Sequence, residues 1–452
     1  MGSSLSTDGS SRKKVVMTSL LFMGLSHILY LKQYLKGALF AIIEIIFLAK
    51  SGWIFQKLYE LIKLDTYYMT SRDTQAPTLE FRMIDGITAL MLIVVFIIAY
   101  VISISSADSA YTDYCLDGRM KSNKESLMDT FGKAFPLFGV APAVILIVFF
   151  VIVPLLFSMI AGFTNWSHLD GNTVSGDVTW VGFQNFVKLF GGNVVGNNSA
   201  GGGEWSTAFA SVAIWTILWG ALATATSYLG GTVLATLLYE CKFKITPVFR
   251  AILILPYAIP SILTLKIWSF LLASNGAVNK TLNLLGIINE NISWLTDNNN
   301  FGLVKTVCIL INMWVGVPYF MLLITGQMTA ISADIYEAAK IDGANGFQVF
   351  TNITLPMVLY QTVPLIIMSF TFNLNNFGAI YFLTGGGPAN AKFTTTTFAG
   401  GTDILITWIY TMSTSNKNYC IASVLAMLIF IVLAPFAVFN FMNTKSFKEG
   451  EL

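Results

Sequence analysis

Long apolar runs separated by short polar segments dominate this chain. Eight of the runs are long enough to cross a membrane, at residues 37–58, 86–104, 138–162, 207–239, 250–273, 302–326, 358–382 and 419–441. A helix of about 20 apolar residues spans the roughly 30 Å of hydrocarbon in a bilayer, so we predict about eight transmembrane helices. Residues 15–31 are apolar but short and carry His27. We expect an interfacial or re-entrant helix there, with a ninth span as the alternative.

The composition agrees with a chain whose solvent is lipid. Hydrophobic residues make up 55% of the sequence and charged residues only 11%, whereas soluble domains carry about 25% charged residues. We therefore predict an all-α polytopic membrane protein. The formal net charge of +2 gives no reason to expect nucleic acid as a partner.

Basic residues in short loops predict the orientation of the chain, because such loops stay in the cytoplasm. The clearest basic signals are Lys242, Lys244, Arg250, Lys445 and Lys448. We therefore place the loop 327–357 and both termini in the cytoplasm. The segments 163–206, 274–301 and 383–418 are then external. Residues 1–14 read as a disordered tail and residues 444–452 as a cytoplasmic tail.

Motifs that would mark an enzyme are missing from the sequence. The phosphate-binding pattern G-x-x-x-x-G-K-[ST] does not occur, so we expect no nucleotide to bind here. The two histidines, His27 and His168, belong to no ligand-spaced or catalytic cluster. The four cysteines lie far apart, which favours small buried hydrophobes over a disulfide framework or a metal site. We expect no catalytic residues, no cofactor and no metal in this chain.

One predicted cytoplasmic loop holds a distinctive run of residues. From Glu337 to Pro356 it reads E-A-A-x-x-D-G-A-x(5)-F-x-x-I-x-L-P. Its Ala-rich first part favours a helix, and Gly343 marks a break. Ser332 and Asp334 are the N-cap candidates of this helix, and Gly346 marks a second break. A second short helix should run from about Phe347 until the chain meets Pro356, so we expect a compact projecting knob.

Two interpretations of this loop follow from its residues. An amphipathic loop would lie on the membrane surface, with Phe347, Phe350 and Ile353 facing lipid. The whole pattern, however, resembles the signature of the permeases of binding-protein-dependent ABC importers, and it is specific because it fixes many positions at once. The resemblance implies that the knob docks in a cleft of an ATP-hydrolysing subunit. It assigns this coupling to Glu337, Ala338, Ala339, Asp342, Gly343 and Ala344, with Phe350, Ile353 and Leu355 packing the loop back on the permease.

The same resemblance implies how the chain is organised. Residues 136–443 form a six-helix ABC importer permease core, in which 327–357 is the cytoplasmic coupling loop. Residues 15–135 form an N-terminal helical extension with an interfacial helix, two spans and a linker. The implied partners are a second permease subunit, two ATP-binding subunits that use ATP and Mg²⁺, and an extracellular sugar-binding lipoprotein. The implied location is a bacterial plasma membrane.

Three stretches resemble the maltose and maltodextrin permeases, both the MalF-like subunits and the Gram-positive MalC type. They are Leu255–Ser261, Asn312–Tyr319 and Phe370–Gly378. The resemblance implies an oligosaccharide site lined by Tyr257, Ser261, Asn312, Val315, Gly316, Tyr319, Ser369, Phe372, Asn373 and Asn376. Amides, hydroxyls and aromatic rings suit the hydroxyl groups and ring faces of a sugar. Helical spacing is expected to place Asn373 and Asn376 on one face.

Several alternatives stay open at this point. An Asn in a membrane helix can instead bridge to a neighbouring helix. The cargo can be a raffinose-type or multiple-sugar substrate rather than maltodextrin. An ion-coupled secondary transporter would need paired carboxylates in the membrane, and the core spans carry almost none. The external segment 163–206 is shorter than the folded insert of some Gram-negative members, which leaves open how a binding protein docks.

Overall fold

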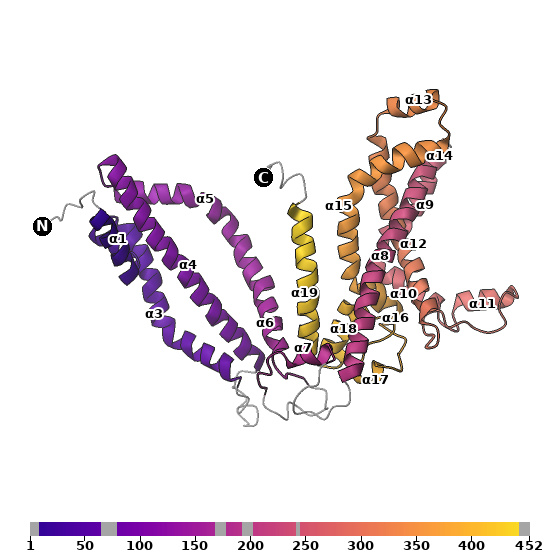
Figure 1. Ribbon diagram of the computed structural model, residues 1–452, viewed down its shortest axis with the longest axis horizontal. Helices are drawn as coiled ribbons and strands as arrows, with labels where there is room; N and C mark the ends of the chain where they lie inside the picture. The colour runs from indigo at the N-terminus through magenta and orange to yellow at the C-terminus, as the bar shows by residue number, and fades with distance from the viewer. Residues whose placement is uncertain (1–8, 65–78, 168–177, 192–201, 241–244, 443–452) are drawn as a thin grey trace. The chain divides into compact units, whose positions relative to one another are not determined.

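A computed structural model describes residues 9–64, 79–167, 178–191, 202–240 and 245–442 (Figure 1). Within these ranges the regular structure is helical, and pairing between extended segments is limited to two isolated bridges. Seven of the described helices are long and apolar enough to cross a membrane, and an eighth span results if one bent helix pair counts as one. The prediction of an all-α polytopic membrane protein with about eight transmembrane helices is therefore confirmed.

Two compact units make up the chain. One comprises Met1–Asn165 with Thr173–Trp180, and the other comprises Trp166–Asn172 with Val181–Leu452. The first unit contains α1 (Gly9–Leu21), α2 (Leu25–Leu29), α3 (Tyr34–Lys63), α4 (Leu79–Asp117), α5 (Asn123–Ile147), η2 (Val148–Ile152) and α6 (Val153–Gly162). Helix α5 crosses residue 135, where we expected the extension to end, without a break.

Helices α3 and α4 pack along each other and form the centre of the first unit. Helix α1 packs on α4, and Arg12 clamps it there through two 2.7 Å hydrogen bonds to the carboxylate of Asp108. The prediction of a disordered tail is therefore wrong for residues 9–14, which are helical, while residues 1–8 and the predicted tail 444–452 lie outside the described residues. Gly24, at a φ of 77°, separates α1 from α2. At 1.5 Å per residue, the 13 residues of α1 cover about 20 Å, which is shorter than the hydrocarbon core. The interfacial placement of residues 15–31 stays a prediction.

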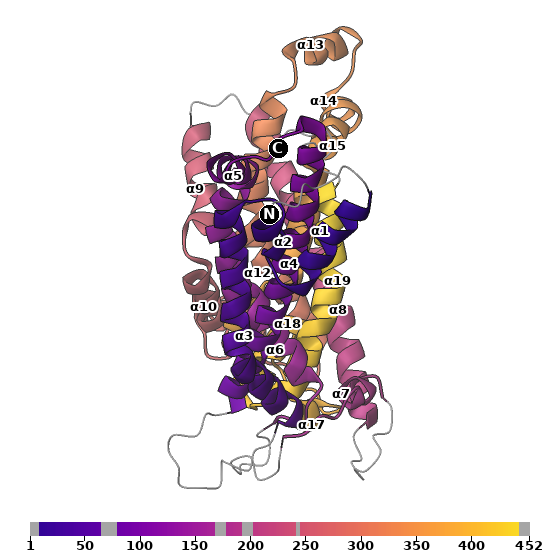
Figure 2. The same ribbon diagram turned by 90° about the vertical axis from the view of Figure 1, so that its left-hand side faces the viewer.

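The second unit holds the longest helices of the core. Its elements are α7 (Gln184–Leu189), α8 (Gly202–Glu240), α9 (Thr246–Ala258), α10 (Ser261–Leu271), α11 (Ala277–Leu284), α12 (Phe301–Thr329), α13 (Ala333–Ile341), α14 (Gly346–Val349), η3 (Phe350–Thr354), α15 (Leu355–Leu374), α16 (Phe377–Thr384), α17 (Thr394–Thr397), α18 (Leu405–Tyr410), η4 (Thr411–Ser415) and α19 (Tyr419–Met442). Helices α8 and α12 pack closely, and α15 lies against α8. Figure 2 shows α13 beyond α14 and α15, at one end of this unit.

Glycines allow the close approach of α8 and α12. A methyl group added at Gly231 would meet the backbone of the facing helix, at 2.8 Å from the nitrogen of Met321. One added at Gly316 would come within 2.6 Å of the hydroxyl of Ser227. Small residues at such crossings let membrane helices gain dispersion contacts, because lipid offers no hydrophobic drive between them.

Two predicted spans are interrupted. The run 250–273 is not one helix, because α9 and α10 meet at an angle of 89°. Ile259 is extended there, as the residue before a proline prefers, and Pro260 precedes the first turn of α10. The run 358–382 divides into α15 and α16, because Asn375 leaves helical geometry and Asn376 caps the new helix.

Candidate functional site

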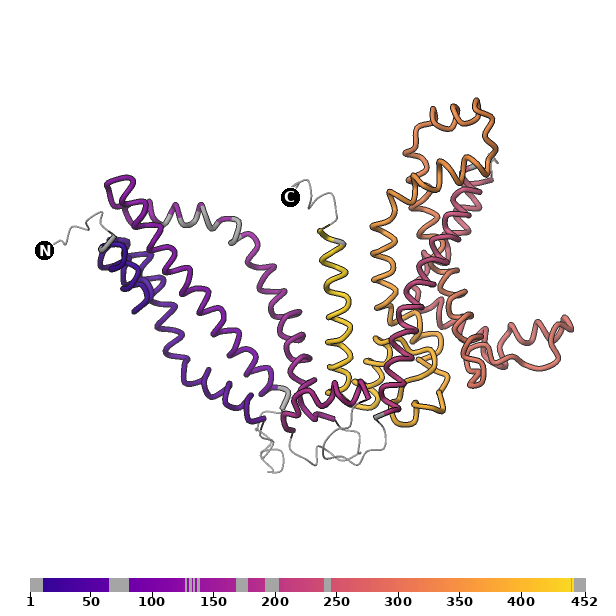
Figure 3. The backbone as a smooth tube through the Cα atoms, viewed as in Figure 1, coloured from indigo at the N-terminus to yellow at the C-terminus, as the bar shows by residue number. Residues whose placement is uncertain are grey.

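The loop from Glu337 to Pro356 forms a projecting helix and a return. The hydroxyl of Ser332 caps α13 by accepting from the amide of Asp334 at 3.3 Å, and α13 ends just before Gly343, whose φ is +80°. The predicted first helix and its glycine break are confirmed. Figure 3 traces the backbone out through α13 and back into α15.

The predicted second short helix is present as α14, which runs at an angle to α15 (Figure 1), but its predicted end at Pro356 is wrong. Asn345 and Gln348 form a reciprocal cap at 2.9 Å in both directions, and the helix that they open continues through Pro356 into α15. Pro356 lies in the first turn of α15, where a proline's missing N–H removes no needed bond. The knob is therefore α13 and α14, and η3 joins α14 to the membrane-spanning α15.

The residues assigned to coupling gather on α13 and its C-terminal turn. Ala339 is buried, and Ala344 is half-buried. The remaining four, Glu337, Ala338, Asp342 and Gly343, are exposed. Such a surface can dock into a partner. Its base is held by Tyr336, whose hydroxyl lies 3.3 Å from that of Thr354. Phe350, Ile353 and Leu355 are half-buried beneath it.

The residues assigned to a sugar site come from four helices of the second unit: α9, α10, α12 and α15, with Asn376 at the start of α16. Tyr257 and Tyr319 bring their rings to 5.9 Å between centroids. Exposed or half-buried side chains are Tyr257, Ser261, Val315, Gly316, Tyr319, Ser369, Phe372 and Asn376, whereas Asn312 and Asn373 are buried. The structure thus brings two tyrosines together and leaves most of the set accessible in the isolated chain.

Asn373 and Asn376 do not share a helix face, so that geometric prediction is wrong. Helix α15 ends at Leu374, between them. The amide of Asn373 donates to the hydroxyl of Thr224 on α8 at 2.9 Å, which is an interhelical bridge. The side-chain oxygen of Asn376 accepts from the amide of Ala379 at 3.4 Å and caps α16.

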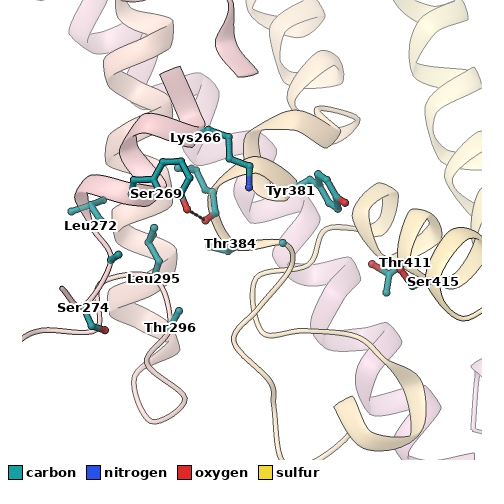
Figure 4. A pocket seen from close by; sticks show the side chains of 14 residues that line it. Lys266, Ser269, Leu272, Ser274, Leu295, Thr296, Tyr381, Thr384, Thr411 and Ser415 are labelled. Atoms are coloured by element: carbon teal, nitrogen blue, oxygen red, sulfur yellow. Dashed lines mark hydrogen bonds between the residues drawn. The ribbon is translucent and has the colours of Figure 1, made fainter. Parts of the chain in front are cut away.

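A cavity of about 680 Å³ lies between α10, α16 and η4, and our sequence reasoning missed it (Figure 4). Its polar lining includes Lys266, Ser269, Tyr381, Thr384, Thr411 and Ser415. Figure 4 shows the Lys266 side chain extending toward Tyr381. The signal that could have found it is the single lysine inside the apolar run 250–273. Among the described residues, no group of three or more His, Cys, Asp or Glu is placed to hold a metal ion.

Comparison with known proteins places these features in context. A family model described as "Binding-protein-dependent transport system inner membrane component" matches residues 227–445. The galactooligosaccharides transport system permease protein GanP of Bacillus subtilis is 33% identical over 424 residues, covering 93% of this chain and 95% of that protein. The maltodextrin transport system permease protein MdxF of the same species is 33% identical over 384 residues, covering 82% and 83%. The maltodextrin permease MalC of Streptococcus pneumoniae is 30% identical over 437 residues, covering 93% of each chain.

Solved structures agree on the fold. A bacterial ABC transporter involved in the import of the acidic polysaccharide alginate aligns with a TM-score of 0.53 at 20% sequence identity. The alignment covers 71% of this chain and all of that one.

Proposed function

This chain belongs to the family of binding-protein-dependent transport system inner membrane components, and from that premise we propose its cargo, its partners and its coupling. It is a multi-pass membrane permease of an ABC importer. Our proposal is that it carries an oligosaccharide of the maltodextrin type. Two relatives of matching length are named for maltodextrin transport, and the hydroxyl, amide and aromatic side chains of the candidate site suit such a cargo.

The exposed helix α13 is the part of this chain that we propose to contact the ATPase. ATP-driven closure of a partner ATPase would move α13, and the continuous helix from Gly346 to Leu374 would carry the movement into the membrane. Helical hydrogen bonding that runs unbroken from α14 through η3 into α15 would transmit such a displacement, whereas a loop would absorb it. The side chains expected to enter the partner's cleft are those of Glu337, Ile341 and Asp342.

The assembly that we propose has one second permease subunit, two ATP-binding subunits and an extracellular sugar-binding lipoprotein. ATP and Mg²⁺ are used by the ATP-binding subunits, and this chain binds neither. Both termini lie in the cytoplasm of a bacterial cell, so α13 faces the ATPase and the segments 274–301 and 383–418 face outward. Sugar would reach the site lined by Tyr257, Asn312, Tyr319, Asn373 and Asn376 from outside and leave it inward by alternating access.

Uptake by the reconstituted complex tests the cargo. The full complex in proteoliposomes, with its binding protein outside, is given radiolabelled maltotriose with and without ATP inside. We expect ATP-dependent accumulation of maltotriose. Accumulation that persists without ATP would contradict the coupling, and failure to accumulate maltotriose while raffinose is carried would contradict the cargo.

A galactooligosaccharide is the second candidate cargo for the same assay, because GanP, named for galactooligosaccharides, matches nearly the whole chain at 33% identity. Galactotriose in the same vesicles separates the two. Uptake of galactotriose without maltotriose would replace the maltodextrin proposal with this one.

A further inference from the structure

The cavity between α10, α16 and η4 is large enough to hold a small molecule. Its volume of about 680 Å³ falls within the range of roughly 300–1,000 Å³ that small-molecule pockets occupy. All of its walls belong to the second unit, and α10 packs directly on α16. The hydroxyl of Ser269 fixes this wall by donating to the carbonyl oxygen of Leu383 at 3.1 Å.

Lys266 gives the cavity an uncompensated positive charge. None of the residues that line the cavity is an Asp, Glu or His, and none of the ion pairs among the described residues involves Lys266. A lysine inside an apolar membrane run is costly unless it faces a cavity, a partner or a substrate. Its ammonium offers three donors and no acceptor. A ligand that fills this cavity must therefore present several acceptor oxygens to Lys266.

The hydroxyls around Lys266 supply the complementary acceptors. Half of the 14 lining residues are Ser, Thr or Tyr. Thr411 donates its hydroxyl to the carbonyl of Thr407 at 3.1 Å, and Ser269 is committed in the same way to Leu383. A hydroxyl that donates to the backbone keeps lone pairs free to accept. Donors on one wall and acceptors on the others match a polyol, whose hydroxyl groups do both.

An aromatic wall completes the match to a sugar ring. Tyr381 stacks on Phe377 with 4.6 Å between ring centroids and meets Tyr410 edge-on at 5.0 Å. These contacts hold the ring of Tyr381 in place beside the cavity (Figure 4). Fixed aromatic faces provide large apolar contact with a polar handle.

The position of the cavity connects it to the candidate sugar site. Ser261 begins α10 and Asn376 caps α16, and both belong to the candidate sugar site. Both helices then run toward the cavity, which Ser269 and Thr384 line. Eight residues of α-helix rise by about 12 Å, so the cavity lies about that far along each helix. In our predicted topology this direction leads outward, since α16 ends at Thr384, inside the predicted external segment 383–418.

We propose that the cavity between α10, α16 and η4 is an outer carbohydrate subsite, in which Lys266 and Tyr381 bind a sugar unit of an oligosaccharide that extends beyond the candidate site. This subsite rests on the proposed sugar cargo. It determines specificity by chain length, because only a saccharide longer than the inner site can reach it.

Uptake kinetics by chain length test the subsite. The full complex in proteoliposomes is assayed with maltose and with maltoheptaose, for the wild type and for Lys266→Met. Removing the charged donor is expected to raise the ratio of the KM for maltoheptaose to the KM for maltose by about tenfold, since bonds to charged groups are the strong ones.

Lys280→Met is the matched control, because Lys280 is an exposed lysine of α11 that does not line the cavity. We expect it to leave the KM ratio as in the wild type. Equal effects of Lys266→Met on both sugars, or none on either, would overturn the subsite while leaving the sugar cargo standing. Loss of assembled complex in Lys266→Met would instead assign Lys266 to a contact with another subunit. If the wild type carries neither sugar, the proposed cargo fails, and the subsite with it.

A thiol-protection assay gives a second, independent readout. Ser415→Cys, in a background whose four native cysteines are replaced, places a reactive group on the cavity wall. Maltoheptaose should slow its labelling by an external maleimide more than maltose does. Equal protection by the two sugars, or none, would contradict the subsite.

Discussion

Gly231 tests whether the close approach of α8 and α12 is a requirement of the fold. The perturbation is Gly231→Ala, which adds one methyl group. That methyl would lie 2.8 Å from the nitrogen of Met321 and 2.9 Å from the carbonyl carbon of Phe320, both backbone atoms that cannot rotate away. The same methyl would lie 2.4 Å from the Cβ of Phe320, which no side-chain rotation moves, and ordinary contact begins at 3.4 Å, so the helices must separate by about 1 Å along this direction.

Two opposing free-energy terms set the expected effect of Gly231→Ala on stability. Ala is favoured over Gly inside a helix by about 1 kcal/mol. Overpacking that moves backbone costs up to about 3 kcal/mol. The net expectation for Gly231→Ala is a loss of about 2 kcal/mol in the free energy of unfolding.

Gly326 provides the matched control on α12, because a methyl added there meets nothing within 4 Å. Gly326→Ala should gain the helix term alone, so the two variants should differ by about 3 kcal/mol. Reversible unfolding of the purified chain in mixed detergent and SDS micelles measures both values. A Gly231→Ala variant as stable as Gly326→Ala would refute the close-packing argument.

Three further predictions concern single side chains. Glu337→Lys should abolish ATP-dependent uptake while the chain still assembles; normal uptake would remove the exposed α13 surface from the coupling step. Asn373→Leu should lower the free energy of unfolding by about 0.6 kcal/mol, the typical value of an interhelical hydrogen bond. Thr224→Val should lower it by the same amount, because it removes the other partner of that bond. A much larger loss of sugar uptake in Asn373→Leu than in Thr224→Val would assign Asn373 to the sugar as well. Burial raises the pKa of the Asp403 carboxyl from 3.8 to about 6 in the segment between α17 and α18, although Thr407 donates to it at 2.6 Å. The folded state therefore holds this proton more tightly than the unfolded state, so stability should fall as the pH rises from about 4 to about 6, and Asp403→Asn should remove that dependence in thermal unfolding scans.

Hydropathy located the membrane helices because every span must be apolar over the length that lies in lipid. The runs 207–239, 302–326 and 419–441 lie inside α8, α12 and α19. The helices extend beyond these runs, however, because hydropathy marks the part in lipid, whereas backbone hydrogen bonding continues into the polar flanks.

Helix breaks were harder to predict, because proline alone does not decide them. Pro256 lies inside α9 and Pro364 inside α15, yet the chain bends at Pro260. At Asn375 no proline is present, and the break depends on the cap that Asn376 gives to α16. Side-chain partners such as Thr224 for Asn373 come from another helix and could not be read from local spacing.

The two breaks give the candidate sites a common physical origin. A broken membrane helix frees backbone carbonyls and amides, which is tolerated only where they face protein or a water-filled path. Here the breaks at Pro260 and Asn375 fall among the residues assigned to the sugar site, and the short helices that follow them, α10 and α16, pack together and line the cavity at Lys266. Interruption of the two spans thus places residues assigned to the sugar site and residues that line the cavity on the same short helices of the second unit. A chain built from unbroken helices would bury its apolar surface as well but would free no backbone groups for an oligosaccharide.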